Sequence, residues 1–152
     1  MKLTEKNIAP EIFLNETLRQ MYLIYLENTI NHFFVNWTYE TFGEVVTTEK
    51  LYKDVWAYVV KNFQYKNDPE DELLTAPKYL ISTKKGDCDD FALFIKTVLA
   101  IYGIKSNFLL CGKNENEFTH ICVLTYDGYI LDGTNNRFNF LDNDYKFIKV
   151  VK

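Results

Sequence analysis

Three side chains, in the order cysteine, histidine and aspartate, supply the parts of a nucleophilic site. Cys88 lies in the segment 86–92 (GDCDDFA), where an apolar helical pattern begins. His120 lies within a β-strand pattern, and Asp132 lies just past a predicted turn. A thiol nucleophile needs a base to remove its proton, and a carboxylate orients that base. These residue types in this order therefore predict thiol-dependent acyl transfer.

Cys88 differs in its surroundings from the other two cysteines. Cys111 and Cys122 lie inside strand patterns, where a cysteine usually acts as a small buried apolar side chain. Cys88 instead lies among carboxylates and precedes the apolar stripe of its helix. The unpaired N–H groups and partial positive charge of a helix start stabilise a thiolate, and the Cys88 N–H could donate to an oxyanion. We therefore expect Cys88 to be the reactive thiol.

The histidine and the aspartate each have a simpler interpretation. A strand histidine such as His120 often bonds only to the backbone, and the chain's other histidine, His32, fits that structural role. Asp132 precedes Gly-Thr-Asn, so it could serve only to form a turn. Their order after Cys88 favours the catalytic set Cys88, His120 and Asp132.

The acidic residues beside the cysteine oppose its ionisation. Asp87, Asp89 and Asp90 raise the thiol pKa, whereas the helix start and a histidine lower it. One explanation places Asp89 and Asp90 in the first helical turn, pointing away and complementing the helix dipole. The other has Asp87, Asp89 or Asp90 holding a hard cation such as calcium, whose charge cancels theirs.

The remaining sequence predicts helices followed by strands. Apolar spacing predicts one or two helices over about 11–34, an uncertain connection over 35–47, and helices from Thr48 to Phe63, from Pro77 to before Gly86, and from Asp89 to Gly103. Residues 67–70 predict a turn. Strands are expected at 106–111, 119–125, 129–132 and 145–151, the last at an edge. This order indicates an α+β fold with an antiparallel sheet.

The catalytic interpretation requires a particular register in the last hairpin. His120 and Asp132 must project from the same face of the sheet, and side chains alternate faces along a strand. A two-residue turn at Asp127-Gly128 would place Asp132 opposite Val123, on the wrong face. A three-residue loop over 126–128, with a left-handed Gly128, places it opposite Cys122 instead. We therefore predict the three-residue loop or an equivalent bulge.

Length and composition set limits on the class of protein. A chain of 152 residues predicts one domain, comprising an N-terminal helical region (1–47), a catalytic core (48–136) and a C-terminal edge segment (137–152). Hydrophobic residues make up 47% and there are 12 Phe, which excludes a disordered protein. With a net charge of −4 and no basic cluster, we expect no nucleic-acid partner.

Location is predicted from what the sequence does not contain. No apolar run approaches the roughly 20 residues of a membrane helix, so we expect no membrane partner. The first residues lead into no signal-type apolar segment, and the three cysteines are scattered. A cytoplasmic location is the default expectation. The sequence leaves the oligomeric state open.

Four segments together resemble the transglutaminase-like superfamily of cysteine enzymes. They are 86–92 (GDCDDFA), 99–104 (LAIYGI), 119–123 (THICV) and 129–134 (YILDGT), within a match over roughly 50–136. The acidic motif is similar to that of bacterial and phage members more than to animal transglutaminases. The resemblance implies a papain-like core in which helices pack on an antiparallel sheet and the nucleophile begins a helix.

The resemblance also implies a role for each site residue. It makes Cys88 the nucleophile, His120 the general base and acid, and Asp132 the group that orients His120. It implies hydrolysis of a peptide or side-chain amide in a peptide or protein substrate, rather than protein cross-linking. The family's second oxyanion donor is a side chain upstream of the cysteine; Trp56 has the right character, but it lies on an apolar stripe.

Three interpretations of function remain at this point. The first is a cysteine peptidase, amidase or acyltransferase that requires no cofactor. The second is a non-catalytic structural or binding protein, of phage or mobile-element origin, that retains the fold. The third is a calcium-binding variant that uses Asp87, Asp89 and Asp90, since some bacterial relatives with a similar acidic motif are calcium-dependent peptidases.

Overall fold

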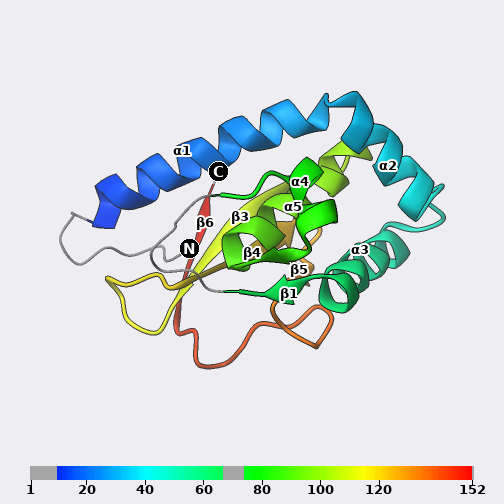
Figure 1. Ribbon diagram of the computed structural model, residues 1–152. Coiled ribbons are helices and arrows are strands. Elements are labelled where there is room, and N and C mark those ends of the chain that lie inside the picture. The colour runs from blue at the N-terminus through cyan, green and yellow to red at the C-terminus, as the bar shows by residue number, and fades with distance from the viewer. Residues whose placement is uncertain (1–9, 67–73, 152) are drawn as a thin grey trace.

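The computed structural model describes residues 10–66 and 74–151 (Figure 1). The predicted turn at 67–70 lies outside the described residues. The elements follow one another as α1 (Pro10–Thr29), α2 (His32–Phe42), α3 (Thr48–Asn62), β1 (Gln64–Tyr65), α4 (Pro77–Thr83), β2 (Lys85–Gly86), α5 (Cys88–Ile101), β3 (Ser106–Gly112), β4 (His120–Thr125), β5 (Ile130–Leu131) and β6 (Phe147–Val151). Helices thus precede the main sheet, and the α+β prediction is confirmed.

The main sheet has four strands in the order β5-β4-β3-β6, and all of its pairings are antiparallel. Helix α5 packs on β4 and β3, and α1 packs against α5 (Figure 1). The short strands β1 and β2 form a separate parallel pair beside the start of α5. This pair positions the chain that enters α5.

Helix α5 begins where its side chains satisfy its own backbone. Asp87 is the N-cap, and its carboxylate accepts from the N–H groups of Asp89 and Asp90. The carboxylate of Asp90 in turn accepts from the N–H of Asp87, which completes a capping box. From Cys88 to Leu99 nearly every side chain is buried, so α5 is the central helix of the fold. Cys88 is therefore fixed at the first position of a rigid element.

Two apolar clusters occupy opposite faces of the sheet. The larger cluster lies between the helices and the sheet and includes Ile121 and Val123 from β4. The smaller cluster contains Leu109, Cys111 and Cys122. Because β4 alternates between them, His120 is expected on the same side of the strand as Cys122.

Several boundaries differ from those predicted. Residues 35–42, interpreted as a connection, continue α2, because Trp37 and Phe42 pack their rings against other aromatic side chains of the core. Thr47 rather than Thr48 caps α3. The two-residue strands β1 and β2 are too short to leave an alternating pattern. In the described part of the chain, no helix combines the length and apolar character needed to cross a membrane.

Candidate active site

The last hairpin adopts the register that the catalytic interpretation requires. Val123 pairs with Leu131 and Leu124 with Ile130, so Asp132 follows directly opposite Cys122. The loop closes with the N–H of Gly128 donating to the carbonyl of Thr125 at 3.0 Å. Gly128 has a φ of +94°, the left-handed conformation that this loop demands of its third residue. The prediction of a three-residue loop is confirmed.

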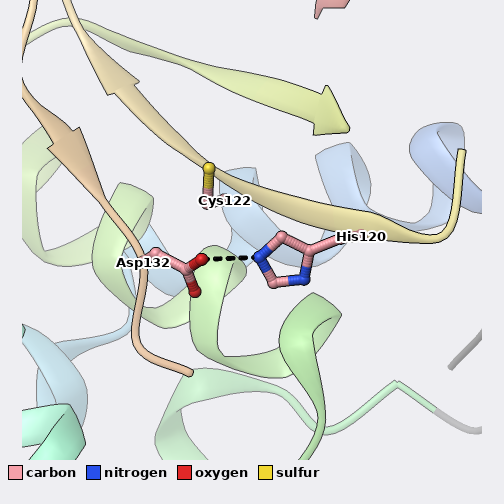
Figure 2. Close-up of side chains that lie close together, drawn as sticks. All are labelled: His120, Cys122 and Asp132. Atoms are coloured by element: carbon pink, nitrogen blue, oxygen red, sulfur yellow. Dashed lines mark hydrogen bonds and ion pairs between the residues drawn. The ribbon is translucent and has the colours of Figure 1, made fainter. Parts of the chain in front are cut away.

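This register brings His120 and Asp132 into direct contact. Nε2 of His120 lies 2.6 Å from Oδ2 of Asp132, and both side chains are buried (Figure 2). The other carboxylate oxygen accepts from the N–H and the hydroxyl of Thr134, at 2.9 and 2.7 Å. Burial raises the pKa of Asp132, but the hydrogen bond and charge of His120 and the bonds from Thr134 outweigh it, so the pKa lies below its usual value. Asp132 is thus held as an anion against the imidazole.

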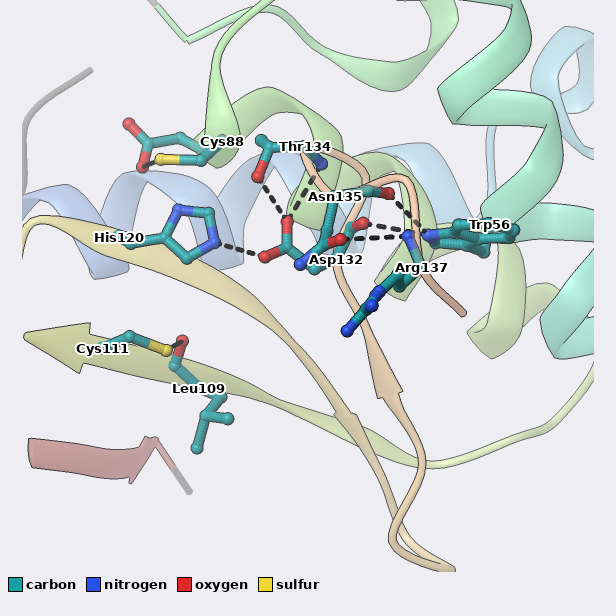
Figure 3. A network of polar contacts seen from close by, with 10 residues as sticks. Trp56, Cys88, Leu109, Cys111, His120, Asp132, Thr134, Asn135 and Arg137 are labelled. Carbon is teal, nitrogen blue, oxygen red and sulfur yellow. Dashed lines mark hydrogen bonds and ion pairs between the residues drawn. The ribbon is translucent and has the colours of Figure 1, made fainter. Parts of the chain in front are cut away.

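A tryptophan secures the turn that carries the aspartate. Nε1 of Trp56 donates to the carbonyls of Asp132 and Asn135, at 3.0 and 3.2 Å (Figure 3). Trp56 therefore does not supply the oxyanion donor considered from the sequence; it fixes the backbone that orients Asp132. Gly133 is required here because a Cβ on it would lie 2.5 Å from Cγ1 of Val59.

The imidazole of His120 is also held from one side of its ring. The ring of Tyr145 stacks on it with centroids 5.2 Å apart and an angle of 8° between planes. Tyr145 lies just before β6, outside the four segments that carry the family resemblance. Sequence reasoning gave it no role, because a tyrosine near an edge strand carries no distinctive signal.

Cys88 lies beside this pair, at the start of α5. In Figure 3, His120 lies between Asp132 and Cys88, with one ring nitrogen on Asp132 and the other on the side of Cys88. The backbone of Ile121, the residue after His120, hydrogen-bonds the Cys88 thiol. The structure therefore brings Cys88, His120 and Asp132 together, although among the described residues no hydrogen bond joins the thiol to the imidazole.

The thiol is not activated in the way expected from the sequence. Cys88 is 3% exposed, and its Sγ donates to Oδ1 of Asp89 at 3.8 Å. Burial, and then the charge of Asp89, raise the pKa of the thiol from 9.0 to about 12, while the bond from Ile121 lowers it only in part. The sequence led us to expect that Asp89 points away from Cys88, and this is wrong because its carboxylate accepts a hydrogen bond from the thiol. Cys88 rests as a thiol, not as a preformed thiolate.

The acidic residues divide into two structural roles. Asp87 and Asp90 serve the capping box, and Asp90 also accepts from the N–H of Thr75 at 2.7 Å. Asp89 is fully buried, and burial raises its pKa to about 7. Burial likewise raises the pKa of Asp90 to about 6. Of these two carboxyl groups with raised pKa values, that of Asp89 contacts the thiol.

These contacts define what the site can do. A thiol, an imidazole and an anionic carboxylate are arranged for nucleophilic attack with proton transfer through the imidazole. Cys88 is also at the first position of α5, where the backbone N–H groups have no partner within the helix. Such N–H groups are suitable donors to a developing oxyanion.

Comparisons with known proteins agree with this architecture. The sequence model of a family described as the transglutaminase-like domain matches residues 36–142, which include all three site residues. No curated protein matches the chain.

Several solved structures share the fold at low sequence identity. A candidate cysteine protease from Cytophaga hutchinsonii is 16% identical with a TM-score of 0.58, over 73% of this chain and 42% of that one. LapG from Legionella pneumophila is 17% identical with a TM-score of 0.56, over 78% of this chain and 73% of that one. Calcium-bound LapG is 16% identical with a TM-score of 0.54, over 91% and 72%. The chain thus spans less than half of the Cytophaga protein and about three quarters of LapG.

Proposed function

The chain belongs to the transglutaminase-like domain family, and from that premise we propose that it is a cysteine peptidase or amidase. Its reaction is the transfer of an acyl group from a peptide or side-chain amide to Cys88 and then to water. The observation that carries this proposal is the buried His120–Asp132 pair beside a cysteine at a helix start. The protein from Cytophaga hutchinsonii that shares the fold is a candidate cysteine protease, which supports the same class of reaction.

The proposed reaction begins with a proton transfer. Because the thiol has a pKa of about 12, few molecules carry a thiolate at neutral pH, so the imidazole must remove the proton as the sulfur attacks. Cys88 Sγ bonds to the carbonyl carbon, and the carbonyl electrons move to its oxygen. The N–H of Cys88 donates to that oxygen, as the first N–H of α5.

The second half of the reaction releases both products. The oxyanion collapses, the carbon–nitrogen bond breaks, and His120 returns its proton to the leaving amine. A water molecule, deprotonated by the same imidazole, then attacks the thioester and restores the thiol. Asp132 stabilises the imidazolium in both halves, since its lowered pKa keeps it ionised. An amine in place of water would give transfer instead of hydrolysis.

Calcium enters the proposal through the residue types of the acidic motif and not through a formed site. Asp87, Asp89 and Asp90 carry the oxygen ligands that calcium prefers, but their carboxylates do not converge as a metal site would require, and those of Asp87 and Asp90 accept from backbone N–H groups in the capping box. An ion held there would supply positive charge beside the thiol, opposing the effect of Asp89. The structure of calcium-bound LapG supports including calcium in the proposal.

A peptide-cleavage experiment tests the proposed function. The protein is incubated with a proteome-derived peptide library, with and without calcium, and new peptide ends are identified by mass spectrometry. We expect cleavage by the unmodified protein, none by Cys88→Ser, and continued cleavage by Cys111→Ser, whose thiol lies in the smaller cluster. Cleavage that persists in Cys88→Ser would show that another residue is the nucleophile.

A further inference from the structure

A second cysteine lies beside the His120–Asp132 pair, and the proposed reaction does not use it. Sγ of Cys122, a ligand nitrogen of His120 and a carboxylate oxygen of Asp132 all lie within 4.8 Å of one another. All three residues are buried, and Figure 2 shows the side chains of His120 and Cys122 on β4 close to that of Asp132 on the chain that follows β5. Among the described residues, this is the one group of three such side chains that converges in this way.

The hairpin register explains why the three meet. His120 and Cys122 are two positions apart on β4, so they project from the same face. Asp132 lies opposite Cys122 in the register of β4 and β5, which places its carboxylate next to both. The loop that brings the histidine and aspartate together therefore also brings in the thiol of Cys122.

The donor set selects a particular class of ion. A thiolate, an imidazole nitrogen and a carboxylate oxygen are the ligands of zinc(II), and three protein ligands leave a fourth position for water. Calcium, a hard cation, takes oxygen ligands instead and would not use the thiol. We propose that His120, Cys122 and Asp132 form a binding site for zinc(II), distinct from any calcium site at the acidic motif.

The distances allow such a site with small movements. In a tetrahedral zinc site, bonds of about 2.0–2.3 Å place the ligand atoms roughly 3.3–3.7 Å apart. The 2.6 Å contact between His120 and Asp132 must then open by about 0.7 Å, and Sγ of Cys122 must approach by about 1 Å at most. Thr134 holds the second oxygen of Asp132, which orients the carboxylate as outer partners of metal ligands do.

Zinc binding would silence the proposed reaction. The ion bonds to Nε2 of His120 and to Sγ of Cys122, and the protons on these atoms leave to solvent. His120 is then bound to the metal and separated from Asp132, so it no longer acts as the base for Cys88. This inhibitory consequence rests on the proposed function, whereas the metal site itself does not.

The test shows whether Cys122 or the proposed nucleophile Cys88 supplies the sulfur ligand. Cobalt(II), which takes zinc sites and absorbs in the near ultraviolet when bound by a thiolate, is titrated into metal-free protein and then displaced with zinc(II). We expect a thiolate–cobalt band that is retained in Cys88→Ser and lost in Cys122→Ser. We also expect zinc affinity to fall at least about 10- to 100-fold in Cys122→Ser, since even the loss of a residue that only hydrogen-bonds a metal ligand lowers metal affinity by that factor.

The other outcomes would overturn the proposal. Absence of the band in the unmodified protein, its loss in Cys88→Ser, or its retention in Cys122→Ser would each place the sulfur ligand elsewhere or exclude a site. Cys122→Ala serves as a second variant, and thermal melting shows whether each variant folds. Because the readout is metal binding, it stands even if the peptide-cleavage experiment finds no activity.

Discussion

Replacing Asp89 by asparagine should release the thiol of Cys88 from its main electrostatic restraint. Oδ1 of Asp89 lies 3.8 Å from Sγ of Cys88, and both groups are buried. A thiolate there faces a carboxylate, and burial together with that charge raises the pKa of the thiol to about 12. Asparagine has almost the same shape and removes only the charge.

The size of the effect follows from the distance. Two unit charges 3.8 Å apart repel by about 4 kcal/mol at an effective dielectric constant of about 20, or about 3 pKa units as an upper value. Relaxation of the site reduces this, so we expect the pKa of Cys88 to fall by about 1–3 units in Asp89→Asn. Burial still acts on the thiol, and its pKa should stay at or above the ordinary value.

The assay is the rate of alkylation of Cys88 by iodoacetamide from neutral to alkaline pH, read by mass spectrometry of the peptide. In Asp89→Asn the rate should rise at lower pH and be at least about tenfold faster under mildly alkaline conditions. Asp90→Asn is the matched control, because Asp90 caps the helix and does not contact the thiol. Equal pH profiles for the unmodified protein and Asp89→Asn would refute the electrostatic account.

Three further changes test the parts that support the site. Gly133→Ala places a Cβ 2.5 Å from Cγ1 of Val59, so the free energy of unfolding should fall by about 1–3 kcal/mol in urea denaturation; an unchanged value would contradict the packing described. Trp56→Phe removes the donor to the Asp132 carbonyl and should lower kcat while leaving KM nearly unchanged, and an unaltered kcat would count against a positioning role. Folding raises the pKa of Asp89 from 3.8 to about 7, so between these pH values the native state binds more protons than the unfolded state. The stability that protonated Asp89 contributes is therefore lost as pH rises from about 4 to about 7. Millimolar calcium should therefore raise the melting temperature more above pH 7 than near pH 5, and a melt that ignores calcium at both would remove the calcium site.

The sequence predicts best where one local rule decides the structure. The apolar stripe predicted the start of α5 to within one residue, and so the place of Cys88, whereas the capping box of Asp87 and Asp90 was seen only in the structure. The need for a left-handed residue at Gly128 specified the hairpin register, and so the contact between His120 and Asp132. These features depend on residues near one another in the chain.

What the sequence did not reveal depends on tertiary contacts. The direction of Asp89 follows from the burial of the whole first turn of α5, which no local pattern encodes. The donation from Trp56 to the Asp132 carbonyl joins residues far apart in the chain. The stacking of Tyr145 on His120 is of the same kind. Cys122 was correctly predicted to be buried, but its closeness to the histidine and aspartate follows only from the completed hairpin.

The most direct test of the central claim is to identify the atom that receives the acyl group. The protein is mixed with p-nitrophenyl acetate, quenched in acid, and mapped by mass spectrometry. The account predicts an acetyl thioester on Cys88 that forms much more slowly in His120→Asn and is absent in Cys88→Ser. Acetylation confined to other residues, or a rate on Cys88 that is the same with and without His120, would contradict it.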